Sequence, residues 1–312
     1  MSAAVPSFRS GEADRQLPVG DEIFLDHVAH FVRDPEAARL ALSRCGFAPT
    51  PVSIQVNSDA SGTAPSGMGN ITTMFQRGYA EVLFKTSDTP LAREFDAMLD
   101  EHPGLHLAAF SVADAEAAQR RLAASGFAVR ELVRMSRPVD TEAGTETAAF
   151  TIARVQPGVM PEGRVQILTH HTEHMVWQKR RLVHPNSAIG LIDVVIAVTD
   201  VDEATQRFTQ FTGRPATRTS GGAVVHLDRG GVYLVNYDRI TDRLPEVAIT
   251  KLPFMAGYVL RVQSLALAEK AVDRADLEWH AFEDGIAAAF PSELGRGAWF
   301  FVESAVGLPW RR

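Results

Sequence analysis

Histidines occur in two stretches of the sequence where their chemistry could be used. The stretch FLDHVAHFVRD contains His27 and His30 among apolar residues, and its spacing suits a strand better than a helix. The stretch QILTHHTEHMVWQ contains His170, followed by His171 and His174. An imidazole can ligate a metal ion or transfer a proton near neutral pH. Each stretch is therefore either a functional segment or a strand that carries polar side chains.

The composition limits the classes of function. The chain has 312 residues, of which 46% are hydrophobic, so it is long enough for two domains with their own cores. Its net charge is -7 and it has no run of Lys and Arg, which excludes the usual electrostatic footprint for nucleic acid or an anionic membrane. We expect a small-molecule substrate or ligand, no membrane segment, and a monomer or a homodimer.

The single cysteine and the N-terminus point to a reducing compartment. Cys45 lies within a predicted helix and has no partner for an internal disulfide, so we expect a small buried hydrophobe. Residues 1–21 are polar, carry charges of both signs and lack the apolar core of a signal peptide. The sequence therefore predicts a flexible N-terminal tail and a cytoplasmic protein.

An internal repeat organises the rest of the chain. The segment HFVRDPEAARLALSRCGF matches AFSVADAEAAQRRLAASGF at a constant offset of 80 residues, and LIDVVIAVTDVDEATQRFTQFTG matches the first at 166. A fainter fourth copy, GYVLRVQSLALAEKAV, follows at an offset of 230. In the first three copies an aspartate, Asp34, Asp114 or Asp200, predicts the N-cap of a helix. Short apolar runs follow each helix, so each unit predicts a strand, a helix and three further strands.

The repeat defines two sets of equivalent positions. The offsets place one residue from each opening strand at the same position: His27, Leu107, Asp193 and Gly257. The closing strands align on a glycine and give a second set: Glu81, Gln166, Tyr233 and Phe300.

Four such units resemble the vicinal oxygen chelate superfamily of glyoxalases, bleomycin-resistance proteins and extradiol dioxygenases, most closely its bacterial glyoxalase-like members. The residues that carry the resemblance are LDHVAHFV, GYAEVLF and VADAEAAQRRLAASGF, within residues 22–304. It implies an α+β fold in which four βαβββ modules pair into two cupped half-barrels. The implied parts are an N-terminal domain, a linker and a degenerate C-terminal domain: 22–170, with modules 22–88 and 104–170, then 171–187 and 188–312.

The resemblance also implies a ligand set, because metal ligands in that superfamily come from the first and last strands of each module. His27, Glu81 and Gln166 then hold a divalent cation, whose identity among Zn, Ni, Co, Mn and Fe stays open. The fourth position is Leu107. His106 comes one residue earlier, on the opposite face of the strand, and becomes a fourth ligand if a β-bulge turns it inward.

No metal site can be built from the equivalent residues of the C-terminal half, which we expect to serve as a scaffold, a lid or a second apolar pocket.

Three functions follow from this reading. The first is a metal-dependent isomerase or lyase acting on a small oxygenated substrate, in which Glu81 moves a proton and the cation acts as a Lewis acid. In that reading His170 is either a substrate contact or a general base. The second is a metal-free protein that sequesters a small ligand in the same cup. The third and weaker one is an extradiol-type dioxygenase, which needs His106 or His170 to complete two histidines and one carboxylate.

Other polar side chains are candidates for substrate binding. Asn70 and Thr72 lie on a predicted strand that leads into the cup, and Arg137 and Arg154 could pair with a substrate carboxylate or enolate. The segment 58–70 is rich in Gly, Ser and Pro, so it predicts a flexible hairpin loop over the cavity, and it lacks the glycine motifs of nucleotide sites.

Overall fold

The computed structural model describes residues 15–59, 62–241, 244, 247–305, 308 and 310. It confirms the α+β class with paired modules. Residues 1–14 of the predicted tail lie outside the described residues. Residues just after them are tied to the body, since the Gln16 amide donates to the Gln76 carbonyl and the Arg229 guanidinium donates to the Arg15 carbonyl.

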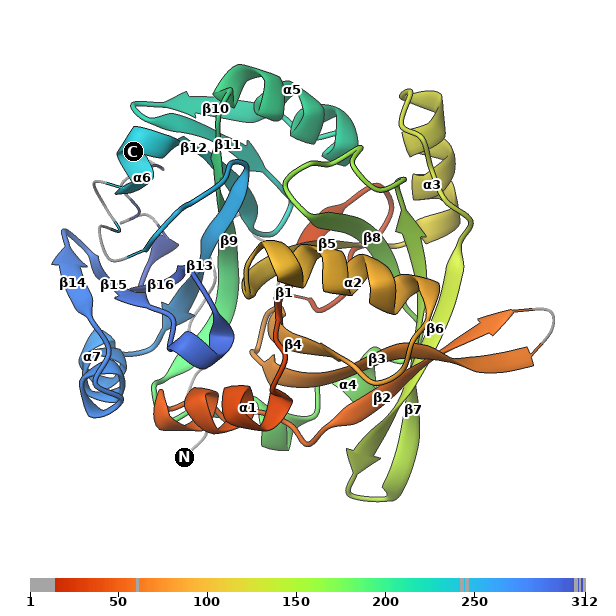
Figure 1. Ribbon diagram of the computed structural model, residues 1–312, viewed down its shortest axis with the longest axis horizontal. Coiled ribbons are helices and arrows are strands. Elements are labelled where there is room, and N and C mark those ends of the chain that lie inside the picture. Colours follow the sequence, from red (N-terminus) through yellow and green to blue (C-terminus); the bar gives the residue numbers. More distant parts are fainter. Residues whose placement is uncertain are drawn as a thin grey trace.

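The first half forms eight strands and three helices (Figure 1). The strands are β1 (Ile23–Phe31), β2 (Ser53–Asp59), β3 (Gly62–Met74), β4 (Tyr79–Lys85), β5 (Gly104–Val112), β6 (Val133–Thr141), β7 (Gly144–Arg154) and β8 (Arg164–His170). The helices are α1 (Pro35–Arg44), α2 (Pro90–Glu101) and α3 (Ala115–Ala124). Their order in space is β1-β4-β3-β2-β6-β7-β8-β5, and the sheet closes into a barrel.

Short turns of helix, α4 (Glu173–Val176) and η1 (Lys179–Arg181), connect this barrel to the second half. The second half consists of β9 (Ala188–Val198), α5 (Val201–Thr212), β10 (Ala216–Thr219), β11 (Gly222–His226), β12 (Gly231–Asn236), α6 (Tyr237–Thr241), β13 (Phe254–Val262), α7 (Leu265–Arg274), β14 (Trp279–Phe282), β15 (Gly285–Ala289), η2 (Ser292–Leu294) and β16 (Ala298–Val302). Its eight strands form an open sheet in the order β10-β11-β12-β9-β13-β16-β15-β14.

The first sheet closes into a full barrel, whereas the sequence predicted a cupped half-barrel. β2 pairs with β6 over three residue pairs, Val56 with Ser136, Asn57 with Met135 and Ser58 with Arg134. The segment 58–70, expected to be a loop, supplies the end of β2 and much of β3 in this closing hairpin. Its glycines and serines leave room for close strand packing, as at Gly69, where an added Cβ would lie 2.6 Å from the Phe84 ring.

The predicted helix caps are present. Asp34 accepts a hydrogen bond from the Ala37 amide at 2.9 Å, and Asp114 and Asp200 accept from amides of their own first turns. Helices α1, α3, α5 and α7 cover one face of the sheets and pack into a core shared by the two halves, whereas α2 and α6 pack with residues of the opposite face. Cys45 is buried in this core, and burial raises the pKa of its thiol to about 12.

Strand register bears out the two internal alignments. The first and last strands of the modules pair His27 with Tyr79, Leu107 with Arg164, Asp193 with Gly231, and Gly257 with Ala298. In each pair the residue of the closing strand directly follows the glycine on which the closing strands were aligned: Gly78, Gly163, Gly230 and Gly297.

A β-bulge recurs beside this position in every module. The register of the paired opening strands skips Asp26, His106, Ile192 and Ala256. The aligned glycines have φ angles from 71° to 141°, and an added Cβ at each would lie 2.6–2.9 Å from the carbonyl oxygen of the bulged residue. Glycine is therefore required there by both conformation and space. None of the described helices is long and apolar enough to cross a membrane.

Candidate functional site

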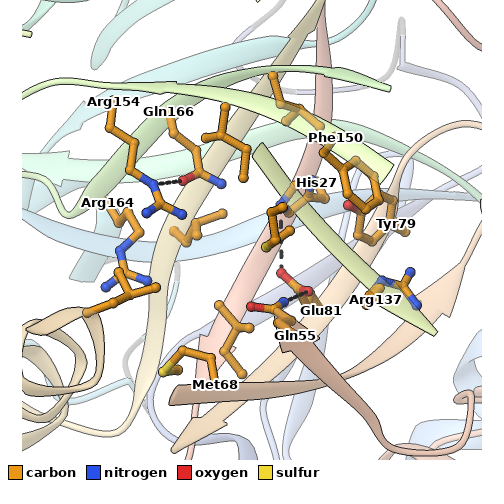
Figure 2. A pocket seen from close by; sticks show the side chains of 16 residues that line it. His27, Gln55, Met68, Tyr79, Glu81, Arg137, Phe150, Arg154, Arg164 and Gln166 are labelled. Carbon is orange, nitrogen blue, oxygen red and sulfur yellow. Dashed lines mark hydrogen bonds and ion pairs between the residues drawn. The ribbon is translucent and has the colours of Figure 1, made fainter. Parts of the chain in front are cut away.

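A cavity of about 30 Å³ lies inside the barrel, with room for roughly one or two water molecules. Strand alternation points side chains from all eight strands into it, and Leu91 of α2 lies against it. Its polar lining residues, shown in Figure 2, are His27, Gln55, Tyr79, Glu81, Arg137, Arg154, Arg164 and Gln166. His27, Glu81 and Gln166 therefore all line one cavity, the arrangement that the two alignments of the sequence predict.

His27 lies at the centre of this lining. The bulge in β1 allows Asp26 and His27, which are adjacent in sequence, to contact each other, and Nδ1 of His27 donates to Oδ1 of Asp26 at 2.8 Å. The other ring nitrogen, Nε2, lies 3.7 Å from Oε2 of Glu81. Tyr79 stacks on the imidazole with the ring centres 4.4 Å apart. The ring is thus fixed with one nitrogen directed at Glu81.

Asp26 holds a second histidine as well. Nε2 of His170 donates to Oδ2 of Asp26 at 2.8 Å, so one carboxylate bridges the two imidazoles. Asp26 is fully buried; burial alone would raise its pKa, but the charges and hydrogen bonds of His170 and His27 together hold that pKa far below its ordinary value. Asp26 is therefore an anion. His170 packs against Phe150 and Trp177 and does not line the cavity.

Glu81 is held through one of its two oxygens. Oε1 accepts hydrogen bonds from the amides of Asn70 and, at 3.4 Å, Gln55. Oε2 is left facing His27. Asn70 thus reaches the site through Glu81, whereas Thr72 bonds to Thr50 at 3.1 Å and lines a different hollow, beside Pro138.

Gln166 lies on the wall but is turned away from His27. Its Oε1 accepts a hydrogen bond from Nε of Arg154 at 2.9 Å, and Figure 2 shows this pair grouped with Arg164 on one side of the cavity, apart from His27 and Glu81. Burial lowers the pKa of Arg154 to about 9, and the charges of neighbouring arginines add to this shift.

Arg137 lies on the other side of the cavity. It makes no hydrogen bond or ion pair with any described residue, and burial lowers its pKa although Tyr79 and Glu81 attract its charge. Arg134, three residues earlier on β6, has a side chain that is 68% exposed and pairs with Glu116. The cavity therefore contains a guanidinium that is free to bind an anionic oxygen.

The prediction for His106 was wrong. A bulge is present at this residue, as the hypothesis required, but its side chain points out of the barrel. Nε2 of His106 donates to the His102 carbonyl at 2.7 Å, and the ring stacks on His102. Burial lowers the pKa of His106 to about 4, so the ring is neutral. Leu107 occupies the fourth position of the wall.

The donor set fits a divalent cation only in part. Ligand atoms about 2.1 Å from one cation are separated by roughly 3–3.5 Å, which the 3.7 Å between His27 Nε2 and Glu81 Oε2 approaches. The bridge to Asp26 is the support that metal-binding histidines generally have. Gln166 is engaged with Arg154, however, and among the described residues no three His, Cys, Asp or Glu side chains form a metal-binding group.

The equivalent cup of the second half is filled by the protein itself. Trp310 stacks on Tyr233 with ring centres 4.6 Å apart, and its Nε1 donates to Asp193 at 3.2 Å. Tyr233 occupies the position that corresponds to Glu81, and Asp193 the position that corresponds to His27. Leu244, Leu308 and α6 complete the filling.

Sequence reasoning missed three functional candidates: Asp26, Gln55 and Arg164. Asp26 is adjacent to His27, and strand alternation puts neighbours on opposite faces unless a bulge intervenes. Arg164 could have been found, because it directly follows the glycine of its closing strand and so corresponds to Tyr79.

Comparisons with known proteins agree with this architecture. The sequence model of the glyoxalase-like domain matches residues 25–212. No curated protein matches the chain.

Solved structures share the fold at low identity. A hypothetical protein from Staphylococcus aureus has a TM-score of 0.61 at 8% identity, covering 89% of this chain and 98% of its own. A triple mutant of 4-hydroxymandelate synthase from Streptomyces coelicolor has a TM-score of 0.51 at 13% identity, covering 92% and 94%. A fusion of a xylose isomerase-like TIM barrel with 4-hydroxyphenylpyruvate dioxygenase has a TM-score of 0.52 at 12% identity, covering 95% and 51%.

Proposed function

Because the chain belongs to the family of glyoxalase-like domain proteins, we propose that its barrel is the active site of an isomerase or lyase acting on a small oxygenated substrate. The observation that carries the proposal is the arrangement of Asp26, His27 and Glu81: a buried carboxylate orients one imidazole toward a second carboxylate inside a cavity.

In this proposal Glu81 moves the proton. Its Oε1 is occupied by Asn70 and Gln55, so Oε2 is the atom that accepts a proton from a carbon next to a carbonyl group. Arg137 binds the oxygen on which negative charge develops. His170 does not line the cavity and acts through Asp26 as a positioning residue.

Two side chains would hold the metal that the family implies: His27 through Nε2, and Glu81 until it takes up the proton. The cation would supply Lewis-acid stabilisation of the negative charge on substrate oxygens. With only two protein donors, the substrate itself must contribute ligand oxygens, which suits a molecule with two neighbouring oxygen atoms.

Substrate entry requires movement of the lining. The cavity of about 30 Å³ is smaller than a substrate. Met68 and Met135 lie on it, and methionine side chains rotate readily about three bonds. Rotation of these two side chains enlarges the cavity without breaking a hydrogen bond.

The second candidate is a metal-free binding protein, and specific observations favour it too. Leu107 occupies one ligand position, and Gln166 is bonded to Arg154. Guanidinium groups on the wall repel a cation and attract an anionic ligand. A dioxygenase has less support, because His106 points out of the barrel and Nε2 of His170 is bonded to Asp26.

Metal analysis separates the two candidates. Untagged protein, purified without chelator, is expected to contain about one divalent metal per chain, and His27→Gln and Glu81→Gln are expected to lose it. The matched controls are His174→Gln and Glu116→Gln, which change exposed residues outside the barrel.

A metal-free parent that binds small ligands equally well in both site variants would refute the enzyme and favour the binding protein.

A further inference from the structure

A second cavity, of about 310 Å³, lies between the two halves of the protein. Its walls come from α2, from the loop that joins β7 to β8, and from the residues that enter β13. This volume is in the range that holds a small organic molecule. It is far larger than the barrel cavity.

The acidic side chains on this wall are already neutralised. Each of them pairs with a cationic side chain: Glu94 with Arg130 at 2.9 Å, Glu101 with Lys251 at 2.7 Å, and Glu162 with Arg207. His102 and His106 also lie on the wall, and burial lowers the pKa of both, that of His106 to about 4. Neither histidine adds a charge at neutral pH.

Arg154 and Arg164 are left without a counter-ion. Both are more than nine-tenths buried and both line this cavity. Within the described residues Arg154 bonds only to the neutral Gln166, and the guanidinium of Arg164 lies over the Phe31 ring at 5.2 Å. Nη2 of Arg164 is buried without any hydrogen-bond partner. Burial lowers the pKa of the two groups to about 9 and about 10, the direction expected of cations that lack an anion.

The rest of the wall is largely apolar. Met98 comes from α2, Met160 from the loop between β7 and β8, and Phe254 and Met255 from β13. Methionine side chains adapt to ligands of different shape. Cationic groups at one place and an apolar surface at another fit an amphipathic ligand that carries an anionic group.

We propose that this interdomain cavity binds a small carboxylic acid with an apolar body. Its carboxylate lies against the guanidinium groups of Arg154 and Arg164, which offer several N–H donors in a planar arrangement. Its apolar body lies against Met98, Met160 and Phe254. The ligand touches both halves. Arg154 and Arg164 also line the barrel cavity, so the variants must distinguish the two cavities.

Calorimetric titration of the full chain with octanoate tests the site, with 1-octanol as the neutral analogue of equal length. At about 30 Å³ the barrel cavity has no room for either molecule as it stands, and Ala97, which lines the interdomain cavity and not the barrel cavity, distinguishes the two. Octanoate is expected to bind and 1-octanol to bind at least tenfold more weakly, since the alcohol lacks the charge.

Two pairs of variants locate the site. Arg164→Met is expected to weaken octanoate binding by about ten- to a hundredfold, the value of one charge-assisted hydrogen bond, whereas Lys251→Met, which removes an exposed and already paired charge at the same cavity, changes it less than about twofold. Ala97→Trp places a large ring at an exposed position on the cavity rim and is expected to abolish binding. Ala117→Trp, at an exposed position of α3, is its control.

A stability measurement separates this role from a structural one. Without octanoate, Arg164→Met is expected to melt at the same temperature as the parent or higher, because it removes a buried charge that has no counter-ion. The proposal is overturned by equal binding of octanoate and 1-octanol, by no detectable octanoate binding at millimolar concentration, or by unchanged affinity in Arg164→Met and Ala97→Trp.

Discussion

Acid is expected to weaken the contact between the two halves through His30. This ring is 1% exposed, its Nδ1 donates to the Leu294 carbonyl at 3.1 Å, and its Nε2 accepts from the Tyr258 hydroxyl at 3.2 Å. Both partners belong to the second half. Burial, with a smaller contribution from His106, lowers the pKa of His30 to about 4 from 6.5, although the hydrogen bond to Leu294 opposes this shift.

The sign and size of the effect follow from linkage. Between pH 6.5 and about 4 the unfolded chain binds a proton at this position and the folded protein does not, so the free energy of unfolding falls as the pH falls. One pKa unit corresponds to about 1.4 kcal/mol, so the whole shift corresponds to about 3 kcal/mol. Between pH 7 and pH 5 the expected loss is about 2 kcal/mol.

Urea unfolding at pH 7 and pH 5 measures this loss for the parent and for two variants. His30→Gln retains a donor and an acceptor but does not titrate, so it is expected to lose about 2 kcal/mol less than the parent between the two pH values. His174→Gln removes an exposed histidine and is expected to follow the parent. Comparing each protein with itself removes any change in packing against Phe290. Equal losses in all three proteins would refute the reasoning.

Three further perturbations have defined outcomes. Asp26→Asn leaves one acceptor for two imidazole N–H groups, so it is expected to lower the free energy of unfolding in urea by about 2–3 kcal/mol. It is also expected to change the tautomer or the hydrogen-bond partner of His27 in imidazole 15N spectra. Unchanged spectra would contradict the bridge that Asp26 forms between His27 and His170. Gly257→Ala places a Cβ 2.1 Å from the Ala298 oxygen and is expected to cost about 3 kcal/mol, seen as a lower Tm. Trp310→Ala is expected to lower the free energy of unfolding by about 3–5 kcal/mol and to expose apolar surface that binds a fluorescent dye. A native Tm without dye binding would argue against the conclusion that Trp310 fills the cup of the second half.

Much of the fold could be predicted because the repeat is regular. Constant offsets between modules carry over into strand register, so the positions of His27 and Glu81 were correct before any coordinates. The capping aspartates and the turn glycines are local features with local causes, and they appear where expected. Closure of the barrel was not predictable, because pairing of β2 with β6 joins residues almost 80 positions apart in segments with weak strand character.

The errors at the site arise from the bulges. A bulge was considered for His106, but the direction in which it turns a side chain depends on the packing around it. At Asp26 the bulged residue turns toward two histidines. At His106, the equivalent residue of the second module, the side chain turns to His102 and Phe31 at the boundary between the halves. One backbone feature therefore produces a carboxylate that orients His27 in one module and a packing contact in the other.

Net charge was the least informative property for the ligand. The chain has a charge of -7, which predicts weak attraction for anions. The interdomain cavity has the reverse character, because Arg154 and Arg164 lack carboxylate partners within the described residues, whereas the acidic groups on its wall are paired. Electrostatic interactions inside a cavity are screened less than those at the surface, so under our proposal these two guanidinium groups outweigh the exposed acidic residues in deciding what binds. The expected sign of the ligand follows from which charges are left unpaired, and only coordinates reveal that.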